Sequence, residues 1–219
     1  MRITPSSPRF LWYWHRFMQK KLRLWTTIVL PQSERLQIRL LGEGRHNLVM
    51  EIAGEECLLR ILRIQYYDLS QPLQTEETIE NCRYMNSLAD FEISPRCEHI
   101  VGGASRVEHA GNLIAPGMIS SRAVIDDIFS RIRRWSLQTG IVIVDYNEGN
   151  WCLRDGHLQF VDFDTQYTCL MSELKTNKVI CKRIDTTRLE EPEAILEAFL
   201  EVEAGLLWDF LQGIELPPS

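Results

Sequence analysis

The stretch GIVIVDYNEGNWCLRDGHLQFVDFDTQYT, residues 140–168, decides the fold of this chain. An apolar run over 141–144 leads into a polar loop, and two short alternating runs follow, over 151–153 and 158–161. The dipeptide Asp155-Gly156 between these two runs is typical of a two-residue β-hairpin turn. The pattern therefore predicts a hairpin whose second strand ends beside the loop that precedes the first.

This predicted hairpin brings Asp145, Asn150 and Asp162 toward one small volume, with Asp164 as a weaker candidate nearby. A phosphoryl-transfer site needs a carboxylate that orients the attacking hydroxyl and accepts its proton. It also needs an amide oxygen and a second carboxylate that hold magnesium on the phosphates. The spacing D-x-x-x-x-N, followed by a hairpin and D-F-D, supplies these groups. The alternative is a surface hairpin in which Asp and Asn only form turns.

The segment resembles the catalytic and metal-binding loops of the protein-kinase-like fold. Its Glu-Gly-Asn ending and its D-F-D are more similar to aminoglycoside and choline phosphotransferases and lipopolysaccharide-core sugar kinases than to protein kinases. The resemblance implies Asp145 as catalytic base, Asn150 and Asp162 as magnesium ligands, and Asp164 as a further metal contact. It also implies an α+β, two-lobed fold, in which a small antiparallel β lobe accompanies a reduced, mainly helical lobe.

Composition and length are compatible with this resemblance and exclude several other classes of protein. The chain has 219 residues, which suffice for two lobes, and a net charge of −6, which argues against a nucleic-acid binder. The sequence contains neither an apolar run of membrane-spanning length nor a recognisable signal peptide. The six cysteines form no C-x-x-C pair, so we interpret them as buried thiols in a reducing compartment and expect a cytoplasmic protein. The expected parts are an extension over 1–33, a first lobe over 34–119 and a second lobe over 120–219.

The N-terminal extension has an unusual composition, because residues 1–30 contain basic but no acidic side chains. Residues 9–25 combine Arg and Lys with Trp, Phe and Leu in a pattern that suits a helix. Such a helix can lie in a membrane interface on the cytoplasmic side. It can equally pack on the small lobe, with its basic stems covering apolar surface, or guide an anionic substrate. The sequence leaves these three interpretations open.

Residues 36–62 alternate as strands do, and Gly42-Glu43-Gly44 interrupts them, followed by Arg45. Glycines let a backbone approach phosphate oxygens, so we assign these four residues to nucleotide binding. The segment GEGRHNLV resembles the N-terminal lobe of inositol-pentakisphosphate 2-kinases and is similar to a PhoP-regulated group of kinase-like proteins.

The kinase resemblance assigns three further residues to the nucleotide. Arg60 stands where protein kinases place the lysine that grips the phosphates, and a solvent-facing arginine is the alternative. Glu80, in a helix expected over 74–88 and capped by Thr75, would pair with that cation, with Glu77 as the alternate. Met118, in Pro116-Gly117-Met118, falls at the hinge where the backbone would bind adenine.

Two further positions depart from the common pattern. Ile143 replaces the usual histidine, and Asn147 replaces a lysine or histidine, so that a cation for the transferred phosphoryl group must come from Arg45, Arg154 or a second magnesium. Outside this region, we expect strands over 93–107 and 111–119, a helix over 122–138, and one or two helices over 189–211 with Pro192 in the first turn.

The sequence thus predicts a phosphotransferase that uses ATP and Mg²⁺ to phosphorylate a hydroxyl of a small-molecule, sugar or lipid-sugar acceptor. A protein Ser/Thr kinase is less favoured, because no activation segment follows Thr168. The substitutions at Arg60, Ile143 and Asn147 favour the alternative of a pseudokinase that serves as a nucleotide-binding or regulatory module. A membrane-surface adaptor is a third alternative, based on residues 9–25 alone.

Overall fold

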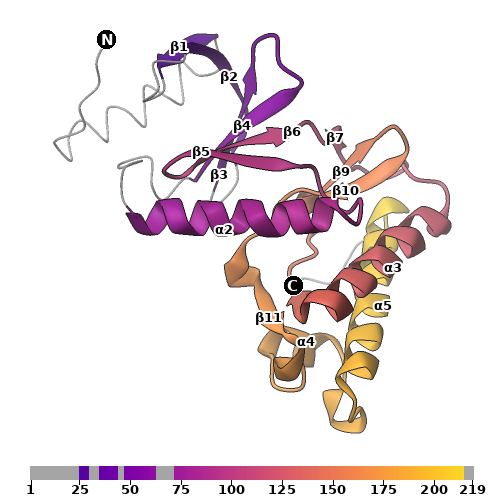
Figure 1. The fold of residues 1–219 in the computed structure, drawn as a ribbon. Coiled ribbons are helices and arrows are strands. Elements are labelled where there is room, and N and C mark those ends of the chain that lie inside the picture. Colours follow the sequence, from indigo (N-terminus) through magenta and orange to yellow (C-terminus); the bar gives the residue numbers. More distant parts are fainter. Residues whose placement is uncertain (1–24, 30–34, 44–46, 63–71, 215–219) are drawn as a thin grey trace. The chain divides into compact units, whose positions relative to one another are not determined.

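The computed structural model describes residues 25–29, 35–43, 47–62 and 72–214 (Figure 1). The fold is mixed α+β, as expected. The chain divides into two compact units, the first formed by 1–83 and 96–109, the second by 84–95 and 110–219. This division differs from the expected boundary after residue 119, because 84–95 and 110–119 belong with the second unit.

The first unit is built on a six-stranded antiparallel sheet with the strand order β1-β2-β3-β4-β6-β5. The alternation over 36–62 is therefore confirmed as three consecutive strands, β2 to β4. The six strands are β1 (Thr26–Val29), β2 (Arg35–Glu43), β3 (Asn47–Ile52), β4 (Cys57–Leu62), β5 (Cys97–Val101) and β6 (Ala104–Glu108).

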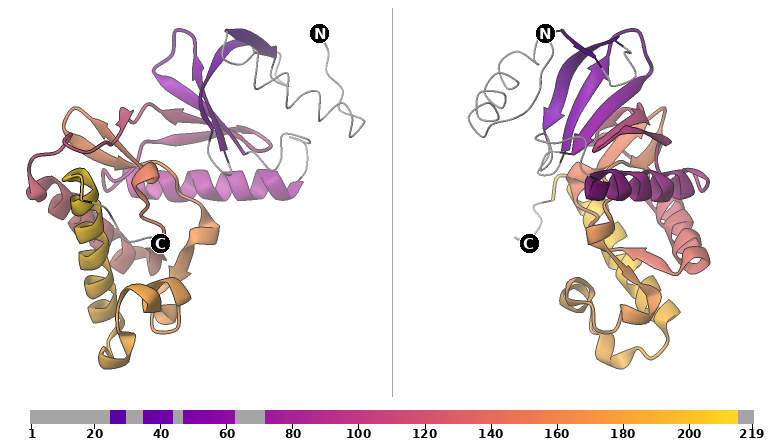
Figure 2. Two further views of the ribbon diagram at one scale, coloured as in Figure 1. Left: turned by 180° about the vertical axis from the view of Figure 1, so that it is seen from behind. Right: turned by 60° about the vertical axis from the view of Figure 1, so that its left-hand side comes forward.

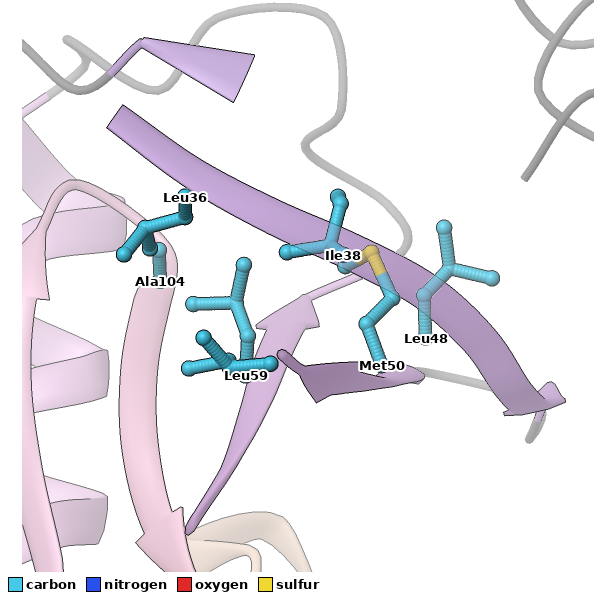
Figure 3. Close-up of a cluster of buried hydrophobic side chains, with 7 residues drawn as sticks. Leu36, Ile38, Leu48, Met50, Leu59 and Ala104 are labelled. Carbon is cyan, nitrogen blue, oxygen red and sulfur yellow. The ribbon is translucent and has the colours of Figure 1, made fainter. Parts of the chain in front are cut away.

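One face of this sheet carries a buried apolar cluster (Figure 3). Because side chains alternate between the two faces of a strand, every second residue of β2 contributes to it. A register shift between Leu40 and Gly42 interrupts the pairing of β2 with β3, which resumes with Gly42 opposite Val49. The cluster consists of Leu36, Ile38, Leu48, Met50, Ile52, Leu59 and Ala104.

Helix α2 (Pro72–Ala89) contributes residues to both units. Its buried positions Thr78, Asn81, Cys82, Met85 and Leu88 recur at the three- and four-residue spacing of one helix face. The predicted helix is confirmed, but the predicted cap is wrong. Thr75 lies inside the helix, which begins three residues earlier at a proline, a residue suited to the first turn.

The second unit packs α3 against α5, two helices that run side by side (Figure 2). It also contains two small sheets, of order β10-β9-β7 and β11-β8. Both predicted helices are confirmed, and Pro192 occupies the first turn of α5. The elements are β7 (Asn112–Leu113), α3 (Arg122–Thr139), β8 (Ile141–Ile143), β9 (Trp151–Arg154), β10 (His157–Phe160), β11 (Thr168–Leu170), α4 (Lys178–Arg183) and α5 (Pro192–Leu211).

The two strands expected over 93–107 and 111–119 are wrong in extent. The first is the hairpin β5–β6, because Gly102 at φ 50° turns the chain between them. The second shrinks to the two residues of β7, because Gly117 at φ 83° forms a turn in which the Met118 N–H donates to the Ala115 carbonyl at 3.2 Å.

The N-terminal segment 9–25 lies outside the described residues except for Trp25. Its indole is 46% exposed and lies under the guanidinium of Arg39, 5.1 Å from the ring centre. Among the described residues, no helix combines the length and apolarity needed to cross a membrane.

Candidate functional site

Two strand pairings hold the segment 141–170 in place. Strands β9 and β10 form the predicted hairpin, with Asp155 at φ 52° and Gly156 at φ 81° in its turn. Positive φ at both central residues matches the right-handed twist of the strands, which explains the Asp-Gly choice. Strand β11 then returns to pair with β8, so that the loop after β8 and the loop after β10 are bounded by the same small sheet.

Main-chain hydrogen bonds connect these two loops directly. The Val161 N–H donates to the Asn150 carbonyl at 2.9 Å, and the Val144 N–H donates to the Tyr167 carbonyl at 3.0 Å. Asp162 comes directly after Val161, which is bonded to Asn150. Asp145 comes directly after Val144, which is bonded to the end of the second loop. The structure thus brings together the three residues predicted from spacing.

Side-chain contacts fix Asn150 and Asn147 around Asp145. The buried Asn150 amide nitrogen donates to the Asp145 carbonyl oxygen at 3.3 Å. Because the nitrogen makes this bond, the Asn150 side-chain oxygen is the atom suited to bind a cation. The Asn147 amide donates to a carboxylate oxygen of Asp145, so this residue contacts the predicted base instead of supplying a cation.

The surroundings of Asp145 raise the pKa of its carboxyl. Burial raises the pKa of this carboxyl, and the negative charge of Asp162 raises it further, while hydrogen bonds from Asn147 and Asn150 oppose the shift. A cation lying between Asp145 and Asp162 would offset the repulsion between their negative charges. The pair therefore suits a divalent ion.

Asp164, expected as a further metal contact, makes hydrogen bonds within its own turn. It is buried at the N-cap of the short 3-10 helix Thr165–Tyr167, where one carboxylate oxygen accepts from the Gln166 backbone N–H at 3.1 Å. Its other oxygen accepts from the Gln166 side-chain amide. Both oxygens thus hold the turn after Asp162, which makes Asp164 a positioning residue.

An aromatic cluster anchors the loop from inside the unit. The Tyr146 ring is buried against four others, and the Trp151 indole donates to the Tyr146 carbonyl at 3.3 Å. Ile143, at the place of the usual histidine, is buried in β8 opposite Thr168. Apolar packing therefore braces the loop where the related pattern uses a histidine. The partners of Tyr146 are Phe129, Trp151, Phe160 and Phe199.

Glu203 on α5 also belongs to this region, although sequence analysis predicted no candidate site residue on that helix. It is 5% exposed, and its carboxylate accepts from the Arg183 Nε of α4 at 3.0 Å. Burial raises the pKa of Glu203, Arg183 lowers it, and the charge of Asp145 raises it. The sequence feature that could have identified Glu203 is an acidic residue within the apolar stripe of an amphipathic helix.

Arg154, one candidate cation for the phosphoryl group, lies at the other end of the hairpin. It pairs with His157 beside the turn, whereas Trp151, next to Asn150, pairs with Phe160. Three residues of strand separate the two positions by about 10 Å. Arg45, the other candidate, lies outside the described residues, so Arg183 is the arginine that the structure links to this region.

The residues assigned to the nucleotide belong to the first unit, apart from Met118. Gly42 is exposed and Glu43 ends β2, while Gly44 and Arg45 lie outside the described residues. Arg60 is 8% exposed, which excludes the solvent-facing alternative. It lies on β4 opposite Ser105.

Glu80 and Met118 both have contacts within their own helix or turn. Glu80 is exposed and pairs with Arg83 of the same helix at 3.4 Å. Met118 is exposed, its N–H is bonded within the turn, and its sulfur accepts from the Ala115 N–H at 3.2 Å.

The oxygen donors present fit a magnesium ion whose remaining ligands come from phosphate and water. Within the described part of the chain, no three His, Cys, Asp or Glu side chains gather around one metal position. Asp162 and Asn150 supply one carboxylate and one amide oxygen, and Asp145 adds negative charge. Magnesium commonly takes one or two carboxylates and completes its shell with phosphate oxygens and water.

Comparison with known proteins gives no family assignment. The sequence matches no protein-family model and no curated protein.

Proposed function

We propose that the chain is a protein-kinase-like phosphotransferase that uses ATP and Mg²⁺ and transfers the γ-phosphoryl group to a hydroxyl of a small-molecule or sugar-like acceptor. One observation carries the proposal. Two separate strand pairings converge so that Asp145, Asn150 and Asp162 occupy adjacent positions in the second unit. A turn-forming role for Asp and Asn does not require this convergence.

The fold supports the same proposal independently. The first unit has an antiparallel sheet with a helix, α2, inserted between β4 and β5, and Arg60 lies on β4. These elements follow one another in the order that the kinase resemblance implies. The glycine segment at the end of β2 comes before them, also in that order.

Each residue then has a defined task. Asp145 orients the acceptor hydroxyl and accepts its proton, for which a raised pKa suits a base that works near neutral pH. Asn150 and Asp162 hold the cation, which neutralises charge on the phosphates. Asn147 and Asn150 fix the position of Asp145, and Asp164 fixes the turn after Asp162.

The test is magnesium-dependent ATP turnover with a panel of sugar and amino-sugar acceptors. Asp145→Asn and Asp162→Asn should each reduce turnover about 100-fold or more, since positioned proton transfer and metal binding contribute at least that much. Asp155→Asn is the matched control, because this aspartate lies at the hairpin turn with its side chain 90% exposed. Turnover that survives Asp145→Asn would show that another group is the base.

A nucleotide-binding module without catalysis is the second candidate, and one contact favours it. The Asn147 amide occupies a carboxylate oxygen of Asp145 that the acceptor hydroxyl would need. In that case magnesium and ATP would raise the Tm of the chain, Asp162→Asn would abolish the rise, and no acceptor would be phosphorylated. Asn147→Ala, which releases the carboxylate, would then give a turnover that the unsubstituted chain lacks.

A further inference from the structure

Two buried cysteines of the first unit lie in direct contact. The Sγ atom of Cys82, on α2, is 2.7 Å from the Sγ atom of Cys97, the first residue of β5. Each side chain is 6% exposed, and 15 residues separate them in the sequence. Because a disulfide bond is about 2.05 Å long, a shift of about 0.7 Å would bring the two sulfur atoms to bonding distance.

The surroundings of this pair distinguish the two sulfur atoms. The pKa of Cys97 is lowered, first by its hydrogen bond with Cys82, then by Ser105 and by the positive charge of Arg60, against the effect of burial. The same hydrogen bond raises the pKa of Cys82, with burial in addition. Cys97 is therefore the more acidic of the two thiols, and it is the one that forms the reactive thiolate more readily.

The other described cysteines lack this arrangement. Burial raises the pKa of Cys57, Cys152 and Cys169 to about 11 in each case, which disfavours the reactive thiolate. Cys181 is exposed at the end of α4. The expectation of six buried thiols is thus wrong for Cys181, which is exposed, and for Cys57, which is only half-buried.

We propose that Cys82 and Cys97 form an oxidation site at which hydrogen peroxide creates a reversible disulfide bond between α2 and β5. The Cys97 thiolate attacks one peroxide oxygen, the O–O bond breaks, and the released hydroxide takes a proton to become water. The Cys82 sulfur then attacks the Cys97 sulfenic acid, loses its proton, and displaces a second water. Two thiols are oxidised to one disulfide while one peroxide is reduced to two waters, and a thiol reductant reverses the bond.

The bond would act on the first unit in two ways. It ties the helix to the sheet and closes a loop of 15 residues, which restricts the unfolded chain. It also removes an ionisable thiol, that of Cys97, whose pKa is lowered by the charge of Arg60. The proposal does not depend on the phosphotransferase function, since it rests on the two sulfur atoms and their neighbours.

The test is peptide mapping of the full chain. The protein is treated with hydrogen peroxide, its remaining thiols are alkylated, and it is digested with trypsin. Cleavage after arginine places Cys82 in the peptide 64–83 and Cys97 in the peptide 97–106, each with one cysteine. We expect the two peptides joined, lighter by two hydrogen atoms, and separated again by dithiothreitol.

Matched variants and a second readout complete the experiment. Cys57→Ser and Cys181→Ser should retain the linked peptides, and Cys82→Ser should lose them. Oxidation should raise the Tm of the unsubstituted chain by several degrees, and the rise should be absent in Cys97→Ser. Peroxide that oxidises Cys181 without linking 64–83 to 97–106, or that links either peptide to another cysteine, would overturn the proposal. Mapping of the unsubstituted chain decides this even when a variant fails to fold.

Discussion

Replacing Gly111 by alanine should strongly destabilise the second unit. Gly111 adopts φ +91°, and a Cβ atom added there would lie 2.1 Å from the Leu153 carbonyl oxygen, 2.6 Å from its carbonyl carbon and 2.9 Å from the Arg154 Cα. All three contacts are with main chain of β9, so no side-chain rotation can relieve them. Leu153 is itself held on both sides, by Leu158 of β10 and Asn112 of β7.

The expected loss of stability has two parts. A non-glycine residue in the left-handed region costs about 1–2 kcal/mol. Moving β7 away from β9 also breaks the pairing at Asn112 and Leu113, and two hydrogen bonds at about 1 kcal/mol each are lost. The sum is about 3–4 kcal/mol, which corresponds to a fall in Tm of about 10 °C.

Gly117→Ala is the matched control for this experiment. Gly117 has nearly the same conformation, φ +83°, but no atom lies within 4 Å of its added Cβ. Only the backbone term applies there, so we expect a loss of about 1 kcal/mol. Urea unfolding followed by tryptophan fluorescence measures both variants. Equal losses for the two would refute the close approach of the chain at Gly111 to β9.

Three further predictions concern the residues around the proposed site. Because burial raises the pKa of Asp145 above that of the unfolded chain, its ionised form destabilises the fold, so Asp145→Asn should stabilise the protein by about 1 kcal/mol at pH 7. Urea titrations should show this gain disappear as the pH falls below about 4, whereas Asp155→Asn should show no such gain. The buried Tyr146 hydroxyl has no hydrogen-bond partner among the described residues, so Tyr146→Phe should leave the Tm unchanged or raise it, and a loss above about 1 kcal/mol would contradict this. Arg183→Met should lower the free energy of unfolding by about 1–2 kcal/mol at pH 7, more than Glu203→Gln, because it leaves the buried Glu203 carboxylate unpaired. This loss of stability should shrink at low pH, where the Glu203 carboxyl is neutral.

Local chemistry explains which elements were predictable from sequence. The hairpin β9–β10 follows from Asp155-Gly156, because few other dipeptides adopt positive φ twice at low cost. Helix α3 follows from apolar residues at helical spacing, and Gly140 at φ 74° ends it. In each case, the determining residues lie within the element itself.

Pairings between distant segments could not be predicted in this way. Strand β11 pairs with β8 although two loops and a hairpin separate them, and the two residues of β7 form a strand only because β9 lies beside them. The glycine pair at 102–103 stood within a run that suited one continuous strand, so the turn between β5 and β6 was missed.

The proximity of the candidate site residues was predictable from the sequence, but their surroundings were predictable only in part. The spacing of Asp145, Asn150 and Asp162 was sufficient to predict that they lie close together, because the hairpin between them pairs adjacent strands. Glu203 was missed because a helix of the same apolar pattern packs equally well with a leucine there. An acidic residue at a buried helix position requires a compensating group, and here Arg183 of α4 supplies it.

This compensation bears on how the proposed site would use a cation. The charge of Asp162 raises the pKa of Asp145, and the charge of Asp145 raises the pKa of Glu203. Arg183 forms its ion pair with Glu203, at 3.0 Å. A divalent ion bound beside Asp145 would offset the excess negative charge that Asp162 places on this carboxyl. Magnesium alone, without nucleotide, should then stabilise the chain in a manner that Asp162→Asn abolishes and Asp155→Asn preserves. If both variants respond to magnesium as the unsubstituted chain does, the excess charge around Asp145 does not hold the ion.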